Sequence, residues 1–171
     1  FGMVEAIIAL HYVFNAPEDK FVFDISHQSY PHKMLTGRAK GFLDVNDMDA
    51  ISGYSSPLEN PEYDNFEIGH TSTSVALASG LQKARDIMGG KENVIAVIGD
   101  GSLSGGEAFE GLDTASEIGT NIIVVVNDNE MSIAENHGGL YKNLKLLRES
   151  NGQAELNFFK AMGFDYMYVE E

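Results

Sequence analysis

Two polar clusters in the sequence combine residue types that suit the binding of a divalent cation. Gly99-Asp-Gly101 follows the apolar run Asn93–Ile98, and Asn127-Asp-Asn-Glu-Met131 follows the apolar run Asn121–Val126. Carboxylate, amide and carbonyl oxygens are the hard ligands that Mg²⁺ prefers, and Mg²⁺ takes only a few of its six ligands from protein. The two clusters are therefore candidates for one magnesium site.

Five residues have roles that follow from this chemistry. Asp100 offers a carboxylate, Asn129 an amide oxygen and Met131 a backbone carbonyl, while a diphosphate and water would complete the octahedron. Gly101 lets the backbone approach a phosphate without a Cβ in the way. A helix predicted from Gly105 would direct its free N–H groups toward the same anion. The clusters together predict a diphosphate site as well as a metal site.

The elements between the clusters must bring them together. Between Gly101 and Asn129 lie 27 residues, enough for a helix over Gly105–Ile118 and the strand over Asn121–Val126. A right-handed crossover returns the chain beside its starting strand, and ligands bind beyond the carboxyl ends of such strands. Asp100 is therefore expected to face Asn129. Gly-Asp-Gly alone is more typical of a simple turn, and only its context favours a site.

The rest of the chain predicts one α/β domain. We expect helices over Phe1–Phe14, Thr71–Met88, with Thr71 and Ser72 as candidate caps, and Gln153–Met162, and one or two helical turns over Tyr30–Leu35. We expect further strands over Phe21–Ile25 and Asp165–Val169, and a long irregular excursion over Gly37–Phe66. Short apolar strands that alternate with helices predict a parallel sheet with helices on both faces.

Composition and charge exclude several classes of partner. The 171 residues include 26 acidic and 11 basic side chains, a formal charge of −15, so a nucleic acid would be repelled. No apolar run is long enough to span a membrane, and no secretory leader is visible. Cysteine is absent, which excludes disulfides and thiolate metal sites and suits a cytoplasmic location. An anionic cofactor would need backbone N–H groups and a cation to overcome this charge.

Three longer motifs make the prediction narrower. They are Asp24-Ile-Ser-His-Gln-Ser-Tyr-Pro-His-Lys33 followed by Leu35-Thr-Gly37, then Gly69-His-Thr-Ser-Thr-Ser74, and Val126-Asn-Asp-Asn-Glu-Met-Ser-Ile133. Together with Gly99-Asp-Gly101, they resemble the N-terminal thiamine-diphosphate-binding domain of the 1-deoxy-D-xylulose-5-phosphate synthases, within the transketolase-like superfamily. The resemblance extends over nearly the whole chain. Ser26 departs from it, because the family usually has Gly before the histidine.

The resemblance implies a role for each matching position. It implies that the magnesium ligands are Asp100, Asn129 and the carbonyl of Met131. It implies that the cofactor contacts are His27, Gly69, His70, Thr71, Gly101, Ser102 and Asn129. His27 is the candidate catalytic residue, as a proton-transfer group near the reactive ring. A capped strand-end histidine is the alternative for His27, and His70 could instead satisfy first-turn amides.

The resemblance also implies an activity for the whole protein. It would be a thiamine-diphosphate- and Mg²⁺-dependent transferase that condenses pyruvate with D-glyceraldehyde 3-phosphate, forming 1-deoxy-D-xylulose 5-phosphate and carbon dioxide. That product leads to isoprenoid precursors, thiamine and pyridoxal. We expect residues 1–171 to be an incomplete diphosphate- and magnesium-binding domain, inactive alone, of a protein that is a homodimer at full length. The pyrimidine-binding and C-terminal domains are expected outside it.

Two other functions stay open at this point. One is a non-catalytic diphosphate-binding subunit, and the other is half of a transketolase-type enzyme. The run Ser26-His-Gln-Ser-Tyr-Pro-His-Lys33 argues against a transketolase.

Overall fold

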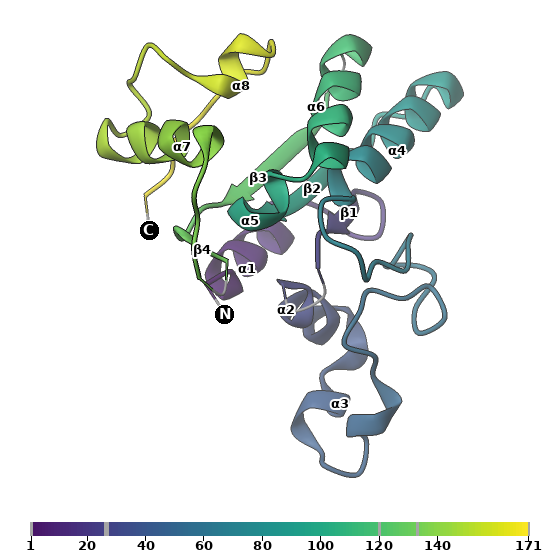
Figure 1. The fold of residues 1–171 in the computed structure, drawn as a ribbon. Helices are drawn as coiled ribbons and strands as arrows, with labels where there is room; N and C mark the ends of the chain where they lie inside the picture. Colours follow the sequence, from purple (N-terminus) through teal and green to yellow (C-terminus); the bar gives the residue numbers. More distant parts are fainter. Residues whose placement is uncertain (1, 26–27, 120, 133, 171) are drawn as a thin grey trace.

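A three-stranded parallel sheet forms the centre of the molecule (Figure 1). The computed structural model describes residues 2–25, 28–119, 121–132 and 134–170. The strands are β1 (Lys20–Phe23), β2 (Val94–Gly99) and β3 (Ile123–Asn127), in the order β1-β2-β3. They are rich in Val, Ile and Phe, which fit a pleated surface that is covered on both sides. The predicted α/β fold with a parallel sheet is confirmed.

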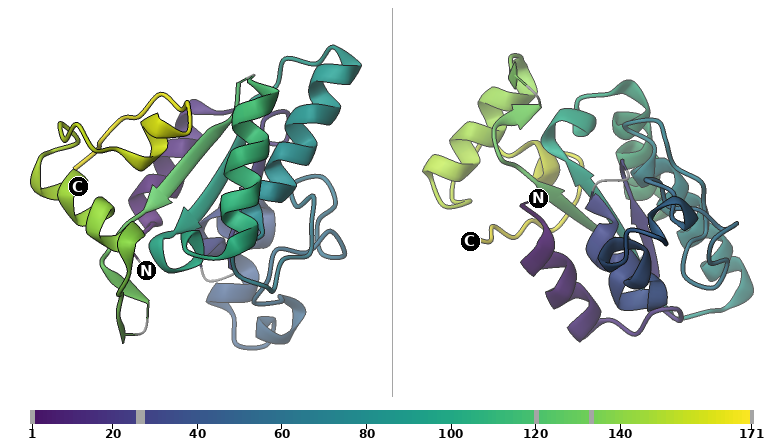
Figure 2. Two further views of the ribbon diagram at one scale, coloured as in Figure 1. Left: turned by 45° about the horizontal axis from the view of Figure 1, so that its top comes forward. Right: turned by 90° about the horizontal axis from the view of Figure 1, so that it is seen from below.

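One face of the sheet is covered by α4 (Ser74–Met88) and α6 (Gly106–Ile118) (Figure 2). Every second residue of β2 points to this face, into a buried cluster that includes Val94, Ala96, Ile98, Val75, Ala78 and Leu112. The two helices approach closely at Gly111, where a Cβ would lie 2.6 Å from the backbone nitrogen of Ala76. Gly89 ends α4 in the left-handed conformation, which glycine adopts readily.

The other face is covered by α1 (Val4–Val13). Ile7 of this helix is fully buried against the alternate residues of the strands, in a cluster with Met3, Phe21, Phe23, Ile95 and Val97. The predicted arrangement, with helices on both faces, is therefore confirmed. The outer side of α1 is also apolar, and Tyr12 is 91% exposed there.

The excursion between β1 and α4 forms a lobe beside the sheet (Figure 1). Its described residues form α2 (Tyr30–Lys33), the wide turn η2 (Met34–Arg38), and then the short α3 (Lys40–Leu43) and η3 (Met48–Ala50). Turns and bends fill most of the remainder. The irregular stretch predicted over 37–66 is confirmed, as are the helical turns near Tyr30.

A short helix follows β2 and a small hairpin follows β3, the two strands that precede the predicted polar clusters. α5 (Asp100–Leu103) comes directly after β2, ahead of α6. β4 (Met131–Ser132) pairs with β5 (Ala134–Glu135) in an antiparallel hairpin after β3. Neither element is predicted from sequence, because each spans only two to four residues.

The C-terminal quarter departs most from the prediction. A helix absent from the prediction, α7 (Gly139–Glu149), precedes a short α8 (Phe158–Ala161) in place of the helix expected over Gln153–Met162. The side chain of Asn157 accepts a hydrogen bond from the N–H of Lys160, so the helix starts only there. The strand expected over Asp165–Val169 is wrong, since residues 164–170 pair with no strand among the described residues.

No helix in the described ranges combines the length and the apolar character that crossing a bilayer requires.

Candidate functional site

The predicted site lies where parallel strands end together. Ile98 is paired with Val126 and Gly99 with Asn127, so the segments after β2 and β3 begin side by side, as predicted. α5 lies against both β3 and β4. The end of β1 joins the same edge, because the N–H of Asp24 donates to the carbonyl of Val97 at 2.7 Å. The catalytic prediction for His27 lies outside the described residues.

Asp100 is the buried acid of this edge. The residue is only 3% exposed, and its Oδ2 accepts a hydrogen bond of 2.8 Å from Nδ2 of Asn136, beyond the β4–β5 hairpin. Burial raises the pKa of Asp100, and the charge of Asp128 adds to this, although the N–H of Gly101 and Asn136 oppose it. A carboxylate that is desolvated and close to a second acid is favourable for a cation.

Asn129 and Met131 lie in the exposed segment that follows β3. Oδ1 of Asn129 accepts the N–H of Met131 at 3.2 Å, so the amide is turned onto its own loop. Glu130 between them has φ +65°, which bends the chain sharply. Because Met131 belongs to β4, which lies against α5, the segments that carry the three predicted metal ligands are neighbours.

Arg148 of α7 holds this segment in place, a role that the sequence did not indicate. Its guanidinium pairs with the carboxylates of both Asp128 and Glu130, which flank Asn129. Partial burial would lower the pKa of Arg148, but the two carboxylates outweigh it and raise the pKa. No motif links an arginine to acids about 20 residues earlier, so only the folded chain could show this contact.

The second predicted cofactor loop, Gly69 to Thr71, lies next to α5. All three residues are exposed, and Nδ1 of His70 donates to the carbonyl of Thr71 at 2.7 Å. The following Ser72 donates from Oγ to the carbonyl of Ser102 at 2.7 Å. The structure therefore brings this loop close to Ser102, another predicted cofactor contact.

The helix after this loop is capped from a distant strand. We predicted Thr71 and Ser72 as caps of α4, but neither side chain caps the helix, which begins only at Ser74. Asp24 does so instead, because its two oxygens accept the N–H groups of Ser72 and Ser74, both at 2.9 Å. The prediction of the caps is wrong because the cap lies 50 residues earlier in the chain.

Gln28 is a further polar residue at this edge that was not predicted as a site residue. It is buried beside Gly99, where Nε2 lies 3.1 Å from the position of a Cβ on that glycine. Its Oε1 has no hydrogen-bond partner among the described residues. A buried acceptor without a partner fits a donor on a ligand or a water molecule. Its one sequence signal is its position after His27.

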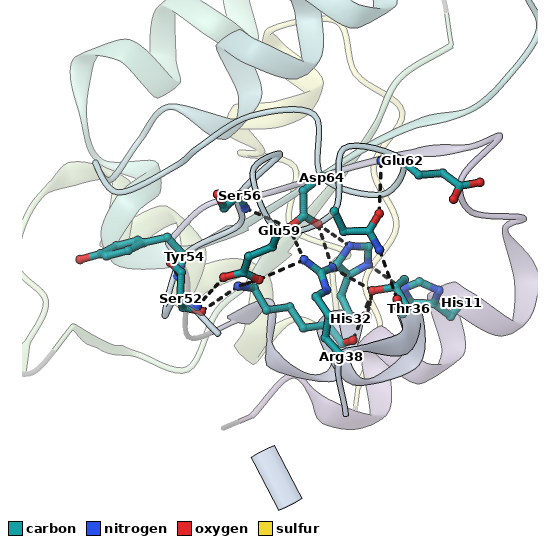
Figure 3. Close-up of polar contacts among 12 residues, drawn as sticks. His11, His32, Thr36, Arg38, Ser52, Tyr54, Ser56, Glu59, Glu62 and Asp64 are labelled. Atoms are coloured by element: carbon teal, nitrogen blue, oxygen red, sulfur yellow. Dashed lines mark hydrogen bonds and ion pairs between the residues drawn. The ribbon is translucent and has the colours of Figure 1, made fainter. Parts of the chain in front are cut away.

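A network of buried charged and polar side chains holds the excursion together (Figure 3). Nε2 of His32 donates to Oδ1 of Asp64 at 3.1 Å, and Arg38 donates to both oxygens of Asp64 at 2.5 and 3.0 Å. His11 of α1 adds a bond of 2.9 Å between its Nε2 and Nδ1 of His32. The fully buried Lys33 pairs with Glu59 at 2.8 Å. The network thus connects α1 and α2 to the far end of the excursion.

The described residues fit a metal–diphosphate group without forming a complete protein cage. No group of three or more His, Asp or Glu side chains is arranged for a metal within the described ranges. Asp100 would supply one carboxylate, and amide, carbonyl and diphosphate oxygens would supply the rest, as Mg²⁺ commonly requires. Gly101 has no side chain that would keep a phosphate away from this segment.

The fold indicates the class of protein. A three-stranded parallel sheet with helices on both faces is consistent with the thiamine-diphosphate-binding, transketolase-like domains. The family described as 1-deoxy-D-xylulose-5-phosphate synthase matches residues 1–167, and the chain belongs to this family.

Curated relatives carry the same name. The 1-deoxy-D-xylulose-5-phosphate synthase of Desulforudis audaxviator is 52% identical over 147 residues, which cover 86% of this chain and 23% of that protein. The synthase of Carboxydothermus hydrogenoformans is 50% identical over 159 residues, which cover 91% of this chain and 25% of that protein. The 1-deoxy-D-xylulose-5-phosphate synthase 2 of Geobacter sulfurreducens is 51% identical over 139 residues, which cover 81% of this chain and 22% of that protein. The chain spans about a quarter of the length of these relatives.

Proposed function

We propose that residues 1–171 are the diphosphate- and magnesium-binding domain of a thiamine-diphosphate-dependent transferase. The full-length protein would condense pyruvate with D-glyceraldehyde 3-phosphate to 1-deoxy-D-xylulose 5-phosphate and carbon dioxide. The observation that carries this proposal is the buried Asp100 directly after the central strand, beside the segment that holds Asn129. Family membership over residues 1–167 supports the choice of reaction.

Each residue has a task in this proposal. Asp100, the amide oxygen of Asn129 and the carbonyl of Met131 bind Mg²⁺, which neutralises the diphosphate in an acidic protein. Gly101 and Ser102 contact the diphosphate through their backbone, and the loop from Gly69 to Thr71 contacts the cofactor from the side of α4. Thiamine diphosphate, when bound, supplies an electron sink for the decarboxylation of a 2-oxo acid. His27 moves a proton at the reacting centre.

The test is the dependence of cofactor binding on the metal. In the full-length protein, calorimetry should detect thiamine diphosphate binding with Mg²⁺ and little without it. Asp100→Ala should weaken that binding about 100-fold or more, because it removes the one charged side chain among the proposed Mg²⁺ ligands. Asp113→Ala, which removes the same charge from the exposed side of α6, is the matched control and should bind normally. Equal affinity with and without Mg²⁺ would contradict the proposal.

His27 has its own test. His27→Ala should lower turnover more than it lowers cofactor affinity, since a proton-transfer group acts on the reaction and not on the diphosphate. An equal loss of both would make it an anchor. A homodimer of the full-length protein and a cytoplasmic location remain predictions from the resemblance.

A further inference from the structure

Asp24 stands at the end of β1 with both carboxylate oxygens committed to one loop. The side chain is fully buried, and its backbone N–H extends the pairing of β1 with β2 through Val97. Oδ1 accepts the N–H of Ser72 and Oδ2 accepts the N–H of Ser74, each at 2.9 Å. Bonds from backbone N–H groups to an ionised carboxylate are shorter and stronger than neutral ones, so this fork fixes the loop firmly to the sheet.

The loop that Asp24 holds has a backbone conformation that serine rarely adopts. Ser72 has φ +73°, a left-handed value that costs free energy for a residue with a side chain. Such a conformation persists only where its surroundings determine it. Here Asp24 holds the N–H of Ser72, while Oγ of Ser72 donates to the carbonyl of Ser102. Gly105 makes room for this Oγ, because a Cβ at that glycine would lie 2.0 Å from it.

These contacts form one continuous connection across the edge of the sheet. Asp24 is bonded to Ser72, and Ser72 is bonded to Ser102 of α5. Each of the three segments carries proposed cofactor contacts. The segment of Asp24 continues to residue 27 in the sequence, the segment of Ser72 contains residues 69–71, and the segment of Ser102 contains residues 100–102. The relative position of these segments therefore depends on the fork at Asp24.

We infer that Asp24 is a positioning residue for the thiamine-diphosphate site, acting through Ser72 to hold the loop 69–71 against α5. The inference rests on the proposed function and deepens it. Asp24 does not itself need to contact the cofactor. A carboxylate is required, because the amide of Asn would keep one acceptor and turn an NH₂ group toward the second N–H.

The chain supplies a matched control at the opposite edge of the sheet. Asp19 precedes β1 and also holds a neighbouring segment, accepting the backbone N–H of Asn93 at 2.7 Å and that of Asn15 at 2.8 Å. Asp19→Asn disturbs a similar carboxylate fork, but at the amino end of the strands. Gly105→Ala is a second variant that leaves Asp24 intact and displaces Ser72 from the other side.

The experiment uses the full-length protein and measures thiamine diphosphate affinity with Mg²⁺, thermal midpoint and turnover. Asp24→Asn should weaken cofactor binding about 10- to 100-fold, the usual range for groups that orient a site. Turnover at saturating cofactor should largely recover, because the reacting groups are unchanged. Gly105→Ala should show the same pattern. Asp19→Asn should lower the thermal midpoint but change cofactor affinity by less than about twofold.

Each outcome decides one point. No metal-dependent binding by the unsubstituted protein would overturn the proposed function itself. If that protein binds and both Asp24→Asn and Gly105→Ala keep its affinity, the proposed function stands and the positioning role is wrong. Equal losses of affinity in Asp24→Asn and Asp19→Asn would reduce Asp24 to a stabilising residue. Should Asp24→Asn fail to fold, Gly105→Ala decides alone.

Discussion

At the scale of single residues, the buried network around Asp64 is expected to have a large effect on the stability of the fold. Asp64 receives hydrogen bonds from His32, from Arg38 and from the N–H of Ser56, the last at 2.9 Å. Burial alone would raise the pKa of Asp64, but these three donors lower it below the usual range. The acid stays ionised in a position where an uncompensated charge is costly.

Removing Asp64 should therefore cause the excursion to unfold before the rest of the chain. Asp64→Ala removes the carboxylate that His32 and Arg38 share and leaves the buried guanidinium with Thr36 and a longer pair with Glu59, at a cost of about 3–5 kcal/mol. Glu149→Ala is the control, because it breaks an exposed pair with Lys145 worth about 0.5 kcal/mol or less. Denaturant unfolding of the chain measures both. A loss below about 1 kcal/mol for Asp64→Ala would show that the network contributes little.

The histidines of the same network predict how stability changes with pH. Burial lowers the pKa of His32, and partial burial beside His32 lowers that of His11 to about 4. Neutral His32 donates through Nε2 to Asp64, so its Nδ1 accepts from His11. Because the unfolded chain takes up protons near pH 6.5 and the folded chain does so only at lower pH, acid favours unfolding.

We expect the thermal midpoint to be highest above about pH 6.5 and to fall between about pH 6.5 and 4. The depressed pKa of Asp64 adds a further loss only below about pH 4, where its unfolded form becomes protonated. Thermal scans followed by circular dichroism from pH 8 to 4 provide the measurement. His11→Phe keeps an aromatic ring on Phe21 and removes one titrating group, so its midpoint should depend less on pH. A midpoint that stays constant down to pH 4.5 would contradict this assignment.

Sequence patterns indicated the acid of the proposed site but not the residues that hold its segments together. Asp100 was predictable because Gly-Asp-Gly lies between a strand and a helix, a local signal that the paired ends of β2 and β3 support. The fork of Asp24 spans 48 and 50 residues, and the pairing of Arg148 with Asp128 spans 20. Such contacts depend on the packed arrangement of elements, which no local spacing encodes.

At the scale of elements, apolar strands were predictable and the C-terminal segment was not. β2 and β3 consist mostly of Val and Ile, and such short β-branched runs favour buried strands. α7 does show helical spacing, since Leu140, Leu144 and Leu147 face the core, but we predicted no helix there. The alternation over 164–168 is real, because Tyr166 stacks on Phe159 at 5.6 Å, yet the segment packs on the cluster without pairing.

The contact between α4 and α6 gives a prediction at this scale. Gly111→Ala places a methyl group 2.6 Å from the backbone nitrogen of Ala76, and backbone cannot move aside as a side chain can. The helices must separate, which should cost about 1–3 kcal/mol. Gly80→Ala is the matched change in α4, where nothing lies within 4 Å of the new methyl, and it should stabilise by about 0.5–1 kcal/mol.

The prediction is that these two substitutions change the free energy of unfolding in opposite directions. Both exchange glycine for alanine within a helix, so helix propensity favours both equally. Only the packing differs. Chemical denaturation of both variants beside the unsubstituted chain gives the two values. Equal stabilisation would mean that the helices tolerate the methyl group, and equal destabilisation would point to an effect that is unrelated to the interface.

At the scale of the whole molecule, the acidic residues are abundant, but three carboxylates near the proposed site already have partners. The chain has 26 acidic residues, yet three described carboxylates at the carboxyl edge of the sheet are already bonded. Asp100 is bonded to Asn136, Asp128 is paired with Arg148, and Asp24 holds two N–H groups. General acid–base catalysis requires a group within hydrogen-bond reach whose proton is free to move. These three do not meet that requirement.

The last prediction is that the 171-residue chain has no synthase activity by itself, even when it is saturated with thiamine diphosphate and Mg²⁺. In the proposed function Asp100 and its neighbours orient the diphosphate, and we expect the acid that activates the cofactor to belong to the pyrimidine-binding domain, which the resemblance places outside residues 1–171. The measurement is release of carbon dioxide and formation of 1-deoxy-D-xylulose 5-phosphate from pyruvate and D-glyceraldehyde 3-phosphate. The full-length protein under the same conditions is the positive control. If the chain turned over substrate above a protein-free blank, and Asp100→Ala abolished that turnover, the chain would contain a complete active site and the division of roles proposed for it would be wrong.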